Sequence, residues 1–223
     1  MLSLHKALLA GADGVELDVQ FNRDLEPYLL HDASLSRVAG LERSIAELSC
    51  AGLQSISVHE AQRFGEQFYP YPIEKLEAIR PLLSQFPNAH FFVEIKLESL
   101  EHISMDAALA KVSAIFRGHE SQIVVISFGY ELIRAARERM SNRVGWVLTN
   151  YNETSRQQAE QLSPDFLISK QRKLPDANLW LGAWQWFAYD IVTMAQYQRM
   201  ERLNVQWIES WNVTGILNQP GHG

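Results

Sequence analysis

Apolar segments of strand length alternate with longer helix-patterned segments along most of this chain. The strand-like runs lie at 15–21, 90–96, 122–128, 143–149, 165–169, 179–186 and 205–210. Segments with helical periodicity lie between them, at 73–86, 101–117, 130–140, 153–162 and 190–203. Repetition of strand and helix predicts a parallel sheet covered by helices. Seven such strands in 223 residues favour a closed TIM (β/α)8-type barrel over an open sheet.

The first strand of such a barrel is missing from the pattern. The chain opens on a helical segment, LSLHKALLAG at 2–11, with no strand-like run before it. Gly11 is a suitable residue to end that helix. We therefore predict an α/β protein with a TIM-type barrel that lacks its first β-strand in this chain.

One region interrupts the alternation. After the strand at 15–21 come a turn-rich stretch, NRDLEP, and then YLLHD, which is typical of the return arm of a hairpin. Residues 33–72 are then irregular, with only short helical hints. We interpret them as a short insertion at the barrel mouth. With no linker or low-complexity segment, residues 1–223 are expected to form a single barrel domain.

Composition narrows the classes of protein. A net charge of −6 argues against a nucleic-acid partner, which would need a basic face. The single Cys50 excludes an internal disulfide and a thiolate zinc cluster. A membrane-spanning helix needs an apolar run of about 18 residues, and the sequence has none. We expect a soluble protein of the cytoplasm, with the periplasm open if a longer N-terminus exists; its oligomeric state is left open.

Two carboxylates occupy an otherwise apolar strand, VELDV. Side chains alternate across a strand, so Val15, Leu17 and Val19 share one face and Glu16 and Asp18 share the other. In a barrel the apolar set packs under the helices and the acids point inward. Such close carboxylates are costly to bury as anions unless a cation neutralises them. Oxygen ligands suit Mg²⁺ or Ca²⁺. The alternative is a solvated strand with a polar face.

The strand FFVEIKL repeats this pattern. Val93, Ile95 and Leu97 share one face, and Glu94 and Lys96 the other. Glu94 is therefore a candidate third metal ligand, and Lys96 a point charge for an anion. A structural ion pair between them is the alternative.

A histidine follows the hairpin arm. His31 is a candidate proton donor to a leaving oxygen, because imidazole titrates near neutrality. The other histidines are interpreted as surface or packing residues, and none forms an i, i+4 zinc pair of the zincin type.

Taken in order, these motifs resemble the glycerophosphodiester phosphodiesterase family. The similar segments are GADGVELDV, the H-D-x-x-L-x-R pattern from His31 to Arg37, E-I-K at 94–96, Ser127-Phe128 and NVQWIES near the end. The resemblance runs from residue 1 to about residue 220. It implies a TIM barrel that hydrolyses glycerophosphodiesters to glycerol 3-phosphate and an alcohol.

The resemblance also implies roles for single residues. Glu16, Asp18 and Glu94 would hold a divalent cation, Mg²⁺ or Ca²⁺. His31 would be one of two catalytic histidines, and Lys96 would contact the phosphate. Trp184 sits where the family has an aromatic residue facing the ligand, with core packing as the alternative for this tryptophan.

The sequence departs from the family at its start. Family members begin with a strand carrying His-Arg-Gly, followed by Pro-Glu-Asn-Thr, and this sequence starts inside the helix that follows. The first catalytic histidine therefore has no counterpart here. This leaves a second hypothesis, a catalytically impaired barrel that binds metal and phosphate. A third is a barrel enzyme acting on another phosphodiester, such as a lysophospholipid.

Overall fold

The computed structural model describes residues 1–217 and contains one large curled sheet covered by helices. The strand order is β10-β9-β8-β7-β6-β5-β1-β2. All neighbours are parallel except β1 and β2, which form an antiparallel hairpin. The strands are β1 (Gly14–Phe21), β2 (Pro27–Leu29), β5 (His90–Ile95), β6 (Ile123–Ser127), β7 (Arg143–Val147), β8 (Phe166–Lys170), β9 (Gln185–Tyr189) and β10 (Trp207–Ile208).

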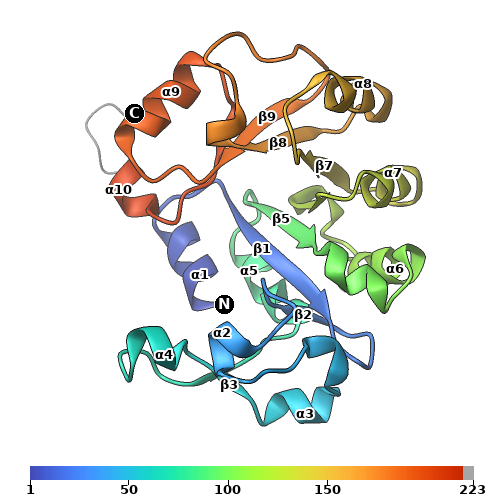
Figure 1. Cartoon of the computed structure of the whole chain (residues 1–223), viewed down its shortest axis with the longest axis vertical. Helices are drawn as coiled ribbons and strands as arrows, with labels where there is room; N and C mark the ends of the chain where they lie inside the picture. Colours follow the sequence, from blue (N-terminus) through green and yellow to red (C-terminus); the bar gives the residue numbers. More distant parts are fainter. Residues whose placement is uncertain (218–223) are drawn as a thin grey trace.

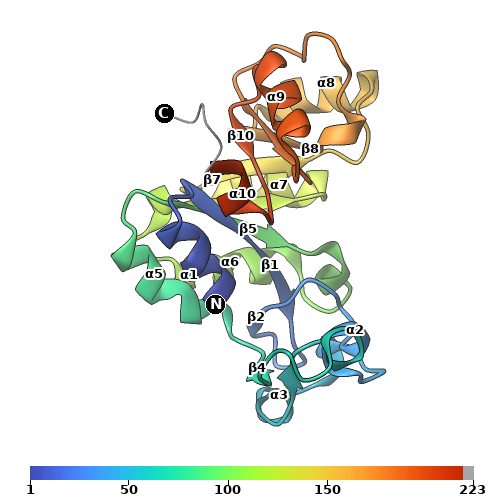
Figure 2. The same cartoon turned by 90° about the vertical axis from the view of Figure 1, so that its left-hand side faces the viewer.

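Helices cover the outside of this sheet (Figures 1 and 2). The α-helices are α1 (Leu2–Leu9), α5 (Arg80–Gln85), α6 (Met105–Ile115), α7 (Tyr130–Arg139), α8 (Glu153–Leu162), α9 (Met194–Arg202) and α10 (Val213–Leu217). Short 3₁₀ segments are η2 (Leu76–Ile79), η3 (Leu97–Glu101), η4 (Glu120–Gln122) and η5 (Gln171–Lys173). Within residues 1–217, no helix is long and apolar enough to cross a membrane.

Strand alternation produces two hydrophobic layers. Outward residues such as Val15, Leu17, Val93 and Ile95 are buried between the sheet and the helices. Inward residues form a second cluster inside the curled sheet, made of Phe92, Val124, Ile126, Val147, Phe166, Ile168 and Phe187. The predicted α/β class and TIM-type arrangement are confirmed.

The curled sheet is open between β10 and β1. These strands are the two parallel strands at the ends of the βα series, and no strand among the described residues pairs between them. Figure 1 shows α1 beside β1, with α10 above α1 in this view. The predicted absence of one barrel strand in this chain is thus confirmed for residues 1–217.

Residues 33–72 form the expected insertion at the carboxyl end of β1. It contains α2 (Ser36–Ala39), η1 (Ile45–Glu47), α3 (Cys50–Gln54), β3 (Ser57–Val58), α4 (Ala61–Phe64) and β4 (Tyr71–Pro72). With the hairpin arm it has a small core of its own, formed by Tyr28, Leu30, Leu35, Ile45, Leu48, Leu53 and Ile73. The insertion lies at the lower end of the view in Figure 1.

One predicted strand is misplaced. The run at 179–186 does not form a strand along its length, because β9 begins at Gln185. The ring of Trp184 lies so close to Gly182 that a Cβ there would come within 2.3 Å of it. Trp180 stacks on Tyr151 at 3.9 Å between ring centroids. The apolar character of this run therefore serves local packing, which periodicity alone does not separate from a strand.

Candidate active site

Three carboxylates meet where the middle of β1 lies beside the carboxyl end of β5. The parallel register places Asp18 directly opposite Glu94. Glu16 lies two residues before Asp18 and shares its inward face. One oxygen from each of the three carboxylates lies within 4.8 Å of the others. The structure therefore brings the three predicted ligands together, and their binding of an ion stays a prediction.

Lys96 follows β5 directly and neutralises part of this cluster. Its ammonium Nζ lies 2.7 Å from Asp18 Oδ1 and 2.8 Å from Glu94 Oε1, and all three side chains are largely buried. Burial acts to lower the pKa of Lys96, but the Asp18 and Glu94 carboxylates outweigh it and raise the pKa above its usual value. Lys96 is therefore a fixed cation with a third N–H available to a ligand.

Glu16 is not neutralised in the same way. Its Oε1 is buried and has no hydrogen-bond partner among the described residues. Burial raises the pKa of Glu16 well above its usual range, and the Asp18 and Glu209 carboxylates raise it further. Burial likewise raises the pKa of Glu94, against the opposing effect of Lys96. An additional positive charge at this place would relieve both carboxyls.

The donor set fits a divalent cation. It consists of carboxylate oxygens alone, which hard cations such as Mg²⁺ and Ca²⁺ prefer. The unpartnered buried oxygen of Glu16 is the atom that such a cation would satisfy. The residues present are therefore compatible with the cation that the sequence predicts.

His31 lies just after β2, at the same mouth. Its ring is largely exposed, and Nδ1 is 2.6 Å from Asp32 Oδ1. Arg37 Nε donates to the other oxygen of Asp32 at 2.6 Å, and Arg37 Nη1 donates to Glu60. Hydrogen bonding from Arg37, opposed by burial and assisted by His31, lowers the pKa of Asp32. The insertion thus supplies a chain of ion pairs that orients the imidazole.

Two residues that sequence reasoning missed hold the backbone of His31. Gln20 is buried on the inward face of β1, and its Nε2 donates to the His31 carbonyl at 3.2 Å. Ser99 Oγ donates to Gln20 Oε1 at 2.5 Å and accepts from the Phe21 amide at 3.0 Å. The sequence signal was the spacing: Gln20 lies two residues after Asp18 and therefore falls on the same inward face of the strand.

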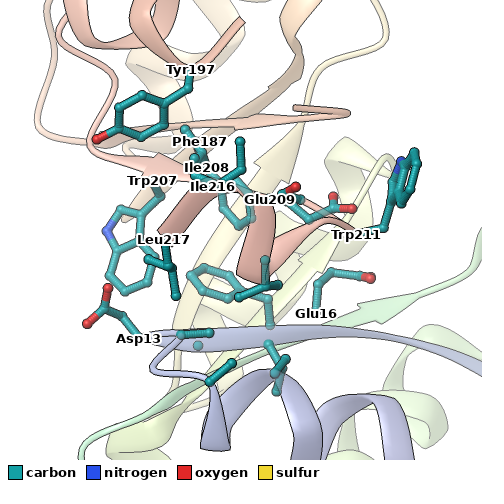
Figure 3. A pocket seen from close by; sticks show the side chains of 18 of the residues that line it. Asp13, Glu16, Phe187, Tyr197, Trp207, Ile208, Glu209, Trp211, Ile216 and Leu217 are labelled. Atoms are coloured by element: carbon teal, nitrogen blue, oxygen red, sulfur yellow. The ribbon is translucent and has the colours of Figure 1, made fainter. Parts of the chain in front are cut away.

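Glu209 was also missed. It directly follows β10 and points with Glu16 into the space between β10 and β1 (Figure 3). Burial raises the pKa of Glu209 to about 7, and the Asp190, Asp18 and Glu94 carboxylates contribute to the rise. Asp190 itself pairs with Lys170 Nζ at 2.5 Å. The signal was an acid at the carboxyl end of a strand, in the segment VQWIES.

Trp184 is not part of this constellation. It precedes β9 at the amino end of that strand, whereas Glu94 lies at the carboxyl end of β5. The side chain is 8% exposed and belongs to the core between sheet and helices. This position corresponds to the core-packing alternative for Trp184.

These features define a class of protein: a TIM-type α/β barrel with an oxygen-rich acidic site and a fixed lysine at its mouth. Comparison with known families makes the assignment specific. A model of the glycerophosphoryl diester phosphodiesterase family matches residues 1–217, and the chain belongs to that family.

The curated relatives are distant in sequence, and they are longer than this chain. Glycerophosphodiester phosphodiesterase 1 of Bos taurus is 26% identical over 144 residues, which cover 65% of this chain and 42% of the bovine protein. A glycerophosphodiester phosphodiesterase of Caldanaerobacter subterraneus is 24% identical over 135 residues, covering 60% of this chain and 53% of that protein. The matched region thus spans about half or less of these relatives.

Solved structures share the fold. A phosphodiesterase of Oleispira antarctica, solved with the product sn-glycerol 3-phosphate, superposes with a TM-score of 0.82 at 20% identity, over 96% of this chain and 87% of that one. A glycerophosphodiester phosphodiesterase of Thermotoga maritima gives a TM-score of 0.69 at 19% identity, over 95% and 87% of the two chains. At such identities the likeness establishes the barrel architecture.

Proposed function

We propose that this chain is a metal-dependent hydrolase that cleaves glycerophosphodiesters to glycerol 3-phosphate and an alcohol, as a step of glycerol and lipid metabolism. Family membership supports the reaction class. The observation that carries the proposal for these residues is the convergence of Glu16, Asp18 and Glu94 within 4.8 Å of one another. We assign the three carboxylates as ligands of Mg²⁺ or Ca²⁺.

The cation would polarise the phosphoryl oxygens and lower the pKa of the attacking group. Lys96 would bind a phosphate oxygen and stabilise the negative charge that develops in the transition state. Its bonds to Asp18 and Glu94 fix the ammonium in place before substrate arrives. The lysine thus acts as a preorganised positive charge.

His31 is assigned to proton transfer. With Nδ1 facing Asp32, the Nε2 atom is left to exchange a proton with the nucleophile or with the leaving alcohol. Asp32 and Arg37 hold the ring in this orientation, and Gln20 holds the His31 carbonyl. The assignment does not decide between the acid and the base role.

The direct test is release of glycerol 3-phosphate from glycerophosphodiesters with choline, ethanolamine or glycerol as the alcohol, with a lysophospholipid in the same panel. Activity that disappears with a chelator and returns with Mg²⁺ or Ca²⁺ supports the proposal. Absence of turnover with every diester and both cations would contradict it. We also propose a cytoplasmic location, on the single Cys50 alone, which fractionation of the source cells tests.

A second candidate function is binding without turnover. The observation that favours it is the opening of the sheet beside Glu16, where residues 1–217 provide no strand. Calorimetric binding of glycerol 3-phosphate in the presence of Mg²⁺, together with absence of hydrolysis, would identify this function. The two assays together separate it from the hydrolase.

A further inference from the structure

Two functional side chains of the proposed site come from separate segments of the chain. Lys96 directly follows β5, whereas His31 follows β2 after the hairpin with β1. The hairpin holds the residue before His31, because the Leu30 N–H donates to the Asp18 carbonyl at 3.1 Å. The place of the imidazole relative to the Lys96 ammonium therefore depends on what holds the chain beyond Leu30.

A buried glutamine holds the chain at His31. Gln20 is 1% exposed, and its Nε2 donates to the His31 carbonyl at 3.2 Å. A side-chain amide has both donor and acceptor atoms, so the same glutamine can hold a second segment through its oxygen. Ser99 Oγ donates to Gln20 Oε1 at 2.5 Å, and Ser99 is also buried. Gln20 thus connects His31 to Ser99.

Ser99 belongs to the segment that carries Lys96. It lies in η3, and its N–H donates to the Lys96 carbonyl at 3.2 Å. The Lys96 N–H donates to the Val19 carbonyl at 3.2 Å, and the Phe21 N–H donates to Ser99 Oγ at 3.0 Å. Both of these bonds attach to β1 beside Gln20. The two side chains therefore form a buried link from the backbone of Lys96 to the backbone of His31.

A buried link of this kind is rigid only while it is complete. Buried polar side chains are almost always hydrogen-bonded, and removal of one partner leaves the others unsatisfied in a medium of low dielectric constant. A displacement of about 1 Å at a reacting group can lower the rate by about 100-fold, even when the mutation lies away from the chemistry. Loss of the link should therefore act on the reaction through the place of His31.

We propose that Gln20 and Ser99 are positioning residues that act as one unit and set the place of His31 relative to Lys96. The inference rests on the proposed hydrolase function, because it assigns the two residues to the reaction of His31. Neither residue contacts the substrate. Their effect appears in the rate of the chemical step.

The first test is kinetic. Gln20→Met keeps an unbranched side chain of similar length and removes both hydrogen bonds of the amide. We expect kcat for glycerol 3-phosphate release to fall by about 10–100-fold, with KM changed by less than about threefold, because His31 acts in the transition state. The Gln20→Met, Ser99→Ala double variant should be no slower than the slower single variant, because residues that act as a unit give non-additive losses.

A small pocket beside the link provides a conservative variant. The pocket has a volume of about 150 Å³ and is lined by Gln20 and Ser99 together with Ala33, Ile45 and His102. It leaves room beside Ser99 for one additional methyl group. Ser99→Thr keeps the hydroxyl and should therefore retain most of the kcat that Ser99→Ala loses.

Gln122→Met is the matched control. Gln122 is also a buried glutamine, and its Nε2 donates to the Phe86 carbonyl at 2.9 Å. It lies in η4 before the amino end of β6, whereas the site lies at the barrel mouth. Both glutamine variants lose a buried amide and should lose stability, but only Gln20→Met should lose kcat.

A second readout needs no substrate. The Asp32 N–H shares a peptide plane with the His31 carbonyl, so its ¹⁵N order parameter reports whether that carbonyl is held. We expect the value to fall from about 0.85 toward about 0.6 in Gln20→Met and to stay unchanged in Gln122→Met.

A Gln20→Met enzyme with kcat within about twofold of wild type would overturn the proposal. So would an equal loss of kcat in Gln122→Met, or a double variant whose loss is the product of the two single losses. If the wild-type chain hydrolyses no diester, the proposed function fails by itself. The order parameter then decides the link alone: a fall at Asp32 in Gln20→Met supports it, and an unchanged value overturns it.

Discussion

Asp18 and Glu94 are register partners on the neighbouring strands β1 and β5, and the ammonium of Lys96 bonds to both carboxylates. Sheet pairing brings the two negative carboxylates together, and the positive ammonium of Lys96 holds both in place. The third acid, Glu16, lies beside them without such a partner for its Oε1 in the described part of the chain. The site has more negative than positive charge, which is the basis of the predictions below.

Lys96→Met removes the cation that neutralises this cluster. Breaking a buried ion pair by deleting one partner costs about 3–5 kcal/mol, because the remaining charges are left uncompensated. We expect a loss of this size in urea denaturation at pH 7 with a chelator present, and partial recovery with Mg²⁺. Lys111→Met breaks the more exposed 2.7 Å pair with Glu26 and should cost only about 0–1 kcal/mol. Equal losses for the two variants would contradict the buried character of the Lys96 pairs.

His31→Gln tests the assignment of proton transfer. Loss of a general acid or base lowers the rate by about 10²–10⁴. The ring of His31 is largely exposed, so the variant should unfold at nearly the wild-type temperature. The check is the rate of glycerol 3-phosphate release, with His119→Gln as a histidine control remote from the mouth. A His31→Gln enzyme of undiminished rate would refute the role.

Glu209 makes stability depend on pH. Burial raises its folded pKa to about 7, above the ordinary 4.5 of an unfolded glutamate. Below pH 4.5 both states hold the proton and the group has no effect. Between these values the unfolded state ionises first, so folding loses free energy as pH rises, and the full penalty of about 3 kcal/mol is present above pH 7.

Glu209→Gln removes this penalty. The variant should be more stable than wild type at pH 8 by about 1–3 kcal/mol, and close to it at pH 4.5. Denaturant titrations at the two pH values measure the difference, and Glu66→Gln is the control at an exposed position. A gain that is the same at both pH values would show that ionisation of Glu209 is not its source.

The parts of the site that alternation controls could be predicted from the sequence. Glu16, Asp18 and Glu94 face inward because their apolar neighbours Val15 and Val93 pack outward, and a period of two fixes this. The opening between β1 and β10 within residues 1–217 followed from the same pattern, since no strand-like run precedes the helical segment at 2–11 in these residues.

Other parts depend on contacts between distant segments. Gln20 reaches the His31 carbonyl and Ser99 only because the hairpin and η3 fold over the end of β1. Trp184 stood in an apolar run that periodicity could not separate from a strand, and its ring packs on Gly182 instead. Such placements are set by tertiary packing, which local pattern does not encode.

Cation binding by Glu16, Asp18 and Glu94 is the central claim, and calorimetric titration with Mg²⁺ and Ca²⁺ tests it most directly. We predict saturable binding of one ion per chain, weakened by about 100-fold or more in Glu94→Gln and in Asp18→Asn. Glu138→Gln, in an exposed pair with Arg134, should bind like wild type. Absence of saturable binding, or equal affinity in wild type and both site variants, would contradict the account.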